Sequence, residues 1–260
     1  KLGFDPSRGG TAPFAKENQV YDSKTKTNVG ANNTAIGLNS MYYNTIGTYN
    51  TAVGSSALSN NTTGSNNTAM GFYSLLLNTS GGNNSAFGFY ALRNNTIGSN
   101  NTAVGYQSLF SNTTGSGNSA FGHYSLRYNT IGTNNTAVGI NALSSNTTGG
   151  SNTAVGRSSL SGNTFGKYNS AFGYQSLFSN TTGDFNSAFG FQSLRNNTIG
   201  TNNSAFGIYA LQSNTTGVKN VAVGRSALQG NTIGASNSAF GYRALRYNTI
   251  GTNNNAFGQN

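Results

Sequence analysis

The chain has 260 residues, of which only 7% are charged, and it holds 36 glycines but no cysteine or tryptophan. The lack of cysteine excludes a disulfide framework and a thiolate metal site. Low charge and abundant glycine also occur in disordered tracts, yet 35% of the residues are apolar and they recur at fixed positions. The composition therefore favours an ordered repeat protein.

The net charge of +10 raises the question of nucleic-acid binding. Five of the fourteen basic residues lie within the first 34 positions beside three acids, and the others are spread singly along the chain. A phosphate-binding surface needs several cations close together. We therefore expect no basic stripe and no nucleic-acid partner. No apolar run approaches the roughly 20 residues that span a bilayer, so no membrane insertion is expected either.

Residues 1–31 do not follow the periodic pattern of the rest of the chain. The stretches Lys1–Pro6 and Thr11–Pro13 predict an extended linker or a cap, because an open solenoid end must be covered to prevent end-to-end growth. The chain begins at Lys1 and stops at Asn260 partway through a unit. We expect it to be a fragment of a longer protein, truncated at the C-terminus.

Residues 32–260 consist of about fourteen copies of one seventeen-residue unit. The alanine of an Ala-[Val/Ile/Met/Phe]-Gly triplet recurs from Ala35 to Ala256 in steps of 17, without insertion or deletion. The unit is A-[VF]-G-x-x-[SA]-L-x-x-N-T-[TI]-G-x-x-N-[TS], and its positions are numbered 1–17 from the alanine. A strict period of this length is typical of solenoids.

Several positions of the unit are nearly or wholly constant and predict structural ladders. Position 10 is always asparagine and is followed by threonine; position 16 is also asparagine, positions 3 and 13 are glycine, and position 7 is leucine except for Met41. The first members of these columns are Asn44, Asn61, Asn78, Asn50, Asn67, Gly37, Gly54, Gly47, Gly64, Leu58 and Leu75.

A weaker alternation with twice this period overlies the repeat. Position 8 holds arginine in some units and a large apolar residue in the units between them. The pattern indicates duplication of a two-unit cassette, with members Arg93, Arg127 and Arg195 alternating with Leu76, Phe110 and Phe178.

The unit predicts an all-β parallel β-solenoid, of the β-roll or β-helix type. Seventeen residues are too few for a two-helix repeat, which needs about 33, and glycine and asparagine disfavour helix. We expect two short strands per coil, one at Thr-Ala-Val-Gly and one at Ser-Ala-Leu, joined by two turns. Coils stacked about 4.8 Å apart would rise roughly 65 Å over fourteen units.

Each constant column has an expected role in this solenoid. The glycines should mark corners that need positive φ or a close backbone approach. The asparagines should adopt the αL conformation and join neighbouring coils through their amides. The leucine and Val/Phe columns should form the continuous core.

Aromatic residues gather at positions 4 and 5, after the first glycine. A thin coil cannot enclose them, and an exposed apolar stripe of this size is an aggregation hazard in a monomer. Burial between identical chains in a side-by-side homotrimer resolves this, since cyclic symmetry is the common arrangement; the alternative is a monomer with singly exposed tyrosines. The predicted interface residues are Phe72, Tyr73, Phe89, Tyr90, Tyr106, Tyr124, Tyr174 and Phe191.

Catalytic chemistry is not expected in the repeats. They contain one histidine, His123, and one acid, Asp184, so neither a carboxylate pair nor a Ser-His-Asp triad can form. No metal-ligand cluster or cofactor motif occurs.

The constant threonine at position 11 raises a separate hypothesis, because regular threonine ladders are typical of ice-binding solenoids.

The segment from Asn50 to Gly71, NTAVGSSALSNNTTGSNNTAMG, resembles the YadA-like head repeats of trimeric autotransporter adhesins. Their unit has the form N-S-x-A-I-G-x-x-[SA]-x-A-x-G, and related repeats occur in tail fibres of phages and large viruses. The unit here is longer, with the extra length around Leu-x-x-Asn-Thr. No binding residue carries over from that family.

The resemblance implies a trimeric attachment fibre, located extracellularly or on a cell or virion surface. Its partners would be the chain itself and a host-surface receptor or glycan. The alternatives are a purely structural extracellular filament or spacer and the ice-binding solenoid.

Overall fold

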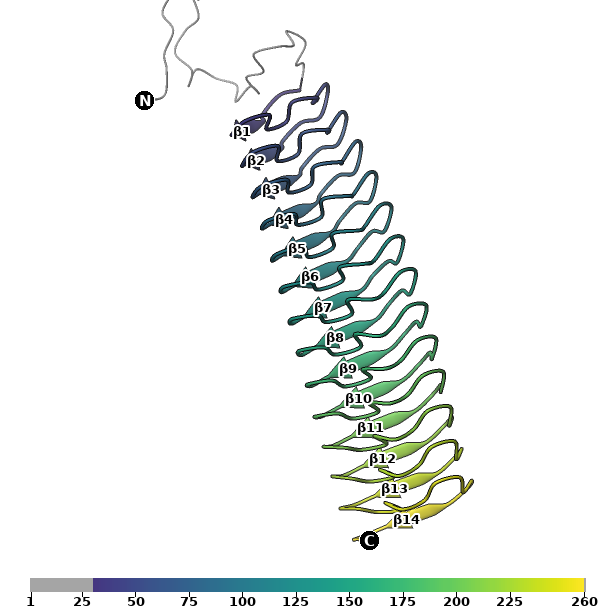
Figure 1. Ribbon diagram of the computed structural model, residues 1–260. Coiled ribbons are helices and arrows are strands. Elements are labelled where there is room, and N and C mark those ends of the chain that lie inside the picture. Colours follow the sequence, from purple (N-terminus) through teal and green to yellow (C-terminus); the bar gives the residue numbers. More distant parts are fainter. Residues whose placement is uncertain (1–29, 260) are drawn as a thin grey trace, which may run out of the picture.

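The computed structural model describes residues 30–259, which form one parallel β-solenoid. Each coil contributes one strand to a single fourteen-stranded sheet, whose strands follow one another in chain order (Figure 1). The strands are β1 (Thr34–Ile36), β2 (Thr51–Val53), β3 (Thr68–Met70), β4 (Ser85–Phe87), β5 (Thr102–Val104), β6 (Ser119–Phe121), β7 (Thr136–Val138), β8 (Thr153–Val155), β9 (Ser170–Phe172), β10 (Ser187–Phe189), β11 (Ser204–Phe206), β12 (Val221–Val223), β13 (Ser238–Phe240) and β14 (Asn255–Phe257). The predicted fold class is confirmed.

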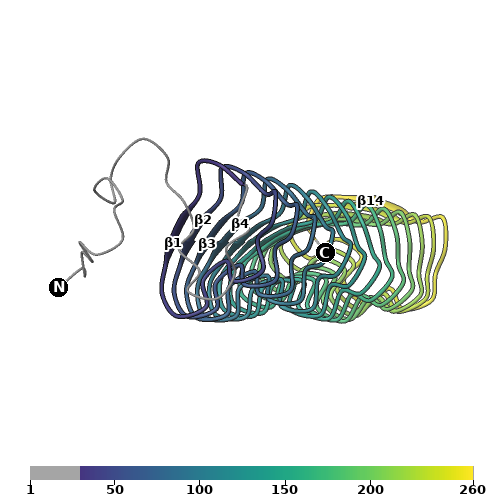
Figure 2. The same cartoon turned by 90° about the horizontal axis from the view of Figure 1, so that it is seen from above.

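Every neighbouring pair of strands is parallel, with each residue paired to the equivalent residue of the next coil. Residues at one position of the unit therefore lie above one another along the whole solenoid, and the coils share one outline (Figure 2). The predicted linker or cap lies, apart from residues 30 and 31, outside the described residues. None of the described residues belongs to a helix that could cross a membrane.

The hydrogen bonds between coils continue beyond the strands. Leu58 N donates to Ser74 O at 3.0 Å, and Thr62 N donates to Thr79 O at 2.9 Å. On the return path the direction reverses, and Asn66 N donates to Thr48 O of the preceding coil at 3.0 Å. Although only three residues per coil are strand, the backbone is bonded to its neighbours on every side of the coil.

The second predicted strand is not formed in any of the described coils. In place of extended backbone, Ser-Ala-Leu belongs to a turn that covers positions 4–9. The leucines themselves have positive φ, for example 52° at Leu143, which a strand does not allow. The αL conformation costs a residue other than glycine about 1–2 kcal/mol. Full burial of the leucine side chain, about 1.5–3 kcal/mol, offsets this cost.

The core differs from the predicted one in one of its two columns. The leucine column is confirmed, since Leu58 to Leu228 are fully buried, but the strand contributes its alanine and not Val/Phe to the core. Position 6, which is alanine or serine as in Ala57, is buried as well. In a strand of three residues the middle side chain points to one face and its two neighbours to the other. The middle residue is the alanine, so Ala137 faces the interior while Val138 is 38% exposed. The interior of the narrow coil has room for the leucine side chain from the turn and, opposite it, only the alanine methyl group from the strand.

The two glycine columns have different causes. Gly139, at position 3, has φ +131°, and an added Cβ would lie 2.7 Å from the carbonyl oxygen of Gly156. Gly132, at position 13, has no positive φ, but a Cβ there would overlap the Asn129 Oδ1 and the carbonyl oxygen of Gly149. The prediction of positive φ or close approach is confirmed: close backbone approach occurs in both columns, and positive φ occurs at position 3 and not at position 13.

Candidate functional site

Two asparagine ladders run through the interior of the solenoid. At position 10, Asn129 Nδ2 donates to Asn112 Oδ1 of the preceding coil at 2.8 Å and to Gly132 O of its own coil at 3.0 Å. Both ladders are fully buried over most of their length. The predicted amide bonding between coils is therefore confirmed.

The ladder at position 16 uses the backbone as well as the side chain. Asn135 donates its N–H to Asn118 Oδ1 at 3.0 Å and its Nδ2–H to Gly149 O at 2.9 Å, while its own Oδ1 accepts the Asn152 N–H at 3.0 Å. The expected αL conformation of the ladder asparagines is wrong. Positive φ occurs one residue earlier, at position 15, as in Asn134 (57°). The position-16 side chains therefore stabilise the turn in which position 15 has positive φ.

The threonine column at position 11 is also tied to the next coil. Thr130 Oγ1 donates to Thr147 O at 3.0 Å, and the same bond recurs along the column. These threonine hydroxyls donate their protons to backbone carbonyl oxygens of the next coil. The column is consequently a structural ladder, and the ice-binding hypothesis built on it gains no support from the geometry.

Removing one of these hydroxyls is expected to have a modest effect. Thr130→Val keeps the shape of the side chain but loses one bond in a half-buried place. We expect a decrease of about 0.5–1.5 kcal/mol in the free energy of unfolding, measured by urea unfolding followed by circular dichroism. Thr114→Val, at the neighbouring variable position 12, is the control and should change the stability by less than about 0.5 kcal/mol. Equal effects of both variants would contradict the role of the ladder.

The outward side of the sheet carries an apolar column without interruption. Position 2 is apolar in all fourteen strands, and position 17 is small and uncharged in all of them. At position 2 the rings stack from coil to coil, with centroids 4.7 Å apart for Phe172 and Phe189 and 5.0 Å for Phe189 and Phe206. This surface, positions 17 and 2 of all coils, is named the sheet face.

The predicted interface residues lie together beside the sheet face. Five occupy position 4 and are between 38% and 41% exposed, and they stack as in the pair Phe72–Phe89 at 5.2 Å. Tyr73, Tyr90 and Tyr124 occupy position 5 and are only half-exposed. The structure thus brings the eight residues onto one side of the solenoid, while the sequence analysis missed the adjoining column at position 2 because it assigned that column to the core.

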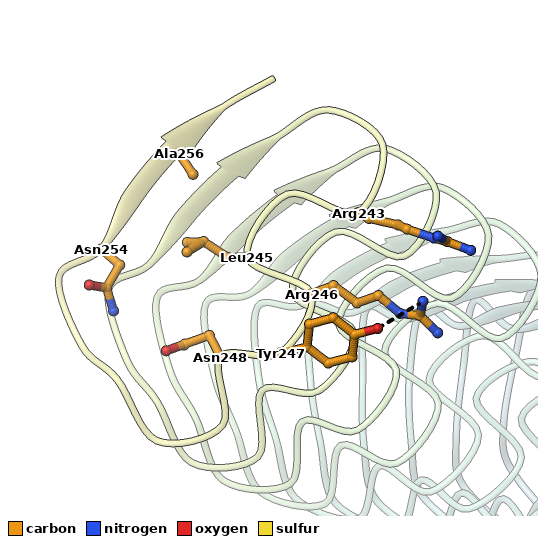
Figure 3. A pocket seen from close by; sticks show the side chains of 7 residues that line it. All are labelled: Arg243, Leu245, Arg246, Tyr247, Asn248, Asn254 and Ala256. Atoms are coloured by element: carbon orange, nitrogen blue, oxygen red, sulfur yellow. Dashed lines mark hydrogen bonds between the residues drawn. The ribbon is translucent and has the colours of Figure 1, made fainter. Parts of the chain in front are cut away.

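All seven arginines of the described residues lie on the turn that follows the sheet, at positions 4, 5 and 8. The guanidinium of Arg127 lies 4.4 Å from the ring centroid of Tyr124, and that of Arg195 lies 5.3 Å from Phe178. Arg243 and Arg246 project from the same side of the coil that begins at Ala239 (Figure 3). Stacking in register places arginines that are far apart in the sequence on the same turn of successive coils. We name positions 4, 5 and 8 the arginine edge.

Glutamines on this edge position some of the arginines. Arg195 Nε donates to Gln175 Oε1 at 3.1 Å, and Arg246 Nε donates to Gln229 Oε1 at 3.0 Å. Arg127 and Gln107 have the same spacing as Arg195 and Gln175, but the Gln107 amide donates to Tyr106 Oη at 3.3 Å instead. In the described part of the chain, Arg127 Nε then has no acceptor. Ring stacking alone holds this arginine.

The two titratable residues considered for catalysis are far apart. His123 stacks on Tyr106 with 5.1 Å between the ring centroids. Asp184 is three coils further along, at position 14, where it accepts the Lys167 backbone N–H at 2.6 Å. Residues 30–259 contain no group of three histidine or acidic side chains that could hold a metal ion.

A hollow at the last coil is lined by Arg243, Leu245, Arg246, Tyr247, Asn248, Asn254 and Ala256. Figure 3 shows that Leu245, Ala256 and the two asparagines point into the coil, while the arginines and Tyr247 lie outside it. These inner residues belong to the core and ladder columns. The hollow is therefore the uncovered end of the solenoid interior.

No protein-family model, no curated protein and no solved structure matches this chain.

Proposed function

We propose that this chain is a structural repeat segment of a trimeric attachment fibre, exposed outside the cell or on a virion, in which the sheet faces of three copies pack together. The observation that supports the proposal is the apolar column at position 2. It is unbroken over fourteen coils and open to solvent in the single chain. Monomeric proteins rarely expose a continuous apolar surface of this size.

The exposed area of the sheet face approaches that of a standard interface. Eight large apolar side chains at position 2 are more than a third exposed, and at roughly 70 Å² each they leave on the order of 600 Å² of apolar surface per chain. The other position-2 residues and the small residues at position 17 are partly exposed and add to this area, while a standard interface buries about 800 Å² per partner.

The charges also favour packing through the sheet face. No residue at positions 17 or 2 is charged, so copies that pack there bury no unpaired charge. Every coil presents nearly the same surface, which suits a cyclic assembly of parallel copies. The number three comes from the resemblance to the head repeats of trimeric adhesins and to tail-fibre repeats.

The sheet face can be tested with a matched pair of double variants. Phe189→Ser with Phe206→Ser removes two stacked rings from the sheet face, and Ile199→Ser with Ile233→Ser removes two residues of similar or greater exposure at position 12. Each phenylalanine contributes roughly 2 kcal/mol of apolar burial per chain. We expect the first pair to dissociate the trimer in sedimentation velocity at micromolar concentration, and the second pair to leave it intact.

The same test has two outcomes that contradict the proposal. If both double variants sediment like the unmodified trimer, the sheet face is not the interface. If the unmodified chain already sediments as a monomer, there is no trimer. Circular dichroism of both variants checks that the coils remain folded.

A further inference from the structure

The arginines of the described residues follow a regular axial period. They occur in the coils that begin at Ala86, Ala120, Ala154, Ala188 and Ala222, which is every second coil, and two more follow in the coil at Ala239. With coils about 4.8 Å apart, this period is about 10 Å. The spacing of two coils is kept although the position within the unit changes. Arg93, Arg127 and Arg195 are at position 8, whereas Arg157 and Arg225 are at position 4. Plain duplication of a two-coil cassette would have repeated the position as well.

The arginine edge carries positive charge that no acid in the described chain neutralises. The one acid among residues 30–259, Asp184, lies at position 14, with Lys167 at the same position and Lys219 at position 15. Five of the seven arginines lie beside aromatic rings, and Arg93 lies within 6.0 Å of the ring centroids of Tyr73, Tyr90 and Phe110. Arg195 and Arg246 also donate to glutamines. The edge therefore offers cations, amides and flat apolar surfaces side by side.

We propose that the arginine edge binds a linear acidic polysaccharide that runs along the solenoid axis, with one carboxylate or sulfate for each two coils. The inference rests on the proposed function, since it names the ligand class of the attachment fibre. A guanidinium binds a carboxylate or sulfate through paired hydrogen bonds, the glutamines can bond to sugar hydroxyls, and the rings can stack against the C–H faces of the sugar. Two coils span a length close to that of one disaccharide.

The spacing of the arginines favours a polysaccharide over a nucleic acid. A nucleic-acid strand carries a phosphate about every 3.4 Å, so arginines about 10 Å apart would meet only one phosphate in three. A polysaccharide with one acidic group per disaccharide carries its charges at the wider spacing. The surface fits this ligand in both charge and period.

The test uses two double variants that change the charge equally. Arg127→Gln with Arg195→Gln removes two cations from the arginine edge, and glutamine already occupies this position at Gln212 and Gln229. Lys167→Gln with Lys219→Gln removes two cations from the other edge. The ligands are hyaluronan, which has one carboxylate per disaccharide, neutral dextran and double-stranded DNA, each measured by biolayer interferometry against the full chain.

We expect the unmodified chain to bind hyaluronan, with at least tenfold weaker binding for the arginine variant and less than a twofold change for the lysine variant. Equal losses in both variants would show attraction to net charge alone and overturn the proposal. Tighter binding of DNA than of hyaluronan, or equal binding of dextran, would overturn it as well.

The outcomes separate this inference from the proposed function. A trimer that binds no hyaluronan overturns the polysaccharide site and leaves a structural fibre or spacer. A monomer that binds hyaluronan with the expected loss in the arginine variant overturns the trimer and leaves the arginine edge.

Discussion

Asn135→Ala is expected to lower the free energy of unfolding by about 2–4 kcal/mol, because it leaves one buried N–H without an acceptor and removes further hydrogen bonds between coils. The substitution removes the acceptor of the Asn152 N–H. Gly149 O loses one of its two side-chain donors and keeps Asn146 Nδ2, and Asn118 Oδ1 keeps the backbone N–H of residue 135. The unsatisfied N–H costs about 1–3 kcal/mol, and each other lost hydrogen bond costs about 0.5–1.5 kcal/mol. Urea unfolding at fixed protein concentration measures the loss, and hydrogen exchange should show faster exchange at the Asn152 amide.

Asn60→Ala is the control for this prediction. Asn60 is half-buried at the variable position 9, where tyrosine, serine and glycine also occur. Its replacement should change the stability by less than about 0.5 kcal/mol. A small effect of Asn135→Ala, similar to that of the control, would show that the ladder asparagine is not needed to hold neighbouring coils together.

Gly139→Ala is expected to lower the free energy of unfolding by about 4 kcal/mol or more. Alanine rarely adopts the φ of +131° found there, and strain of this kind costs about 1–3 kcal/mol. In addition, the new Cβ would lie 2.7 Å from the carbonyl oxygen of Gly156, which belongs to the backbone of the next coil. Because every coil contacts only its neighbours, we expect local opening around this coil, measured by hydrogen exchange and by a lower urea midpoint.

Gly150→Ser is the matched control. Gly150 has no positive φ, a Cβ there would lie 3.1 Å from the Thr133 carbonyl oxygen, and serine occupies the same position in other coils, for example Ser99. We expect a change of less than about 1 kcal/mol. Similar losses for the two glycine variants would contradict the argument from φ and backbone clash.

Several features of the solenoid could be predicted from the sequence because they depend on the period alone. The strict repeat period predicted the parallel register, and the constant Asn44 and Gly47 predicted an amide ladder and a corner. The burial of Leu58 also follows from a constant apolar column. These predictions needed no knowledge of how the coil closes.

Other features depend on how the coil closes and could not be predicted from the pattern. In a strand of three residues, Ala52 and Val53 are equally consistent with either face, and only the space left by Leu58 decides in favour of alanine. The positive φ of Leu58, at 52°, has no sequence signal, since leucine is not a residue that favours αL. For the same reason Ser-Ala-Leu resembled a strand.

The arginine edge was missed because its members are far apart in the sequence. Arg127 and Arg195 are separated by four whole repeat units, but stacking in register places them on one side of the solenoid. A projection of the sequence onto the unit, position by position, contains this signal. Counting basic residues along the chain does not.

The central claim, that the sheet face packs against further copies of the chain, is tested most directly by the molar mass of the unmodified protein in solution. Multi-angle light scattering in non-denaturing buffer should give three times the chain mass of 26.9 kDa, unchanged on dilution through the micromolar range. A mass of one chain over that range would contradict the claim, because the apolar column at position 2 would then be exposed to water in the native protein.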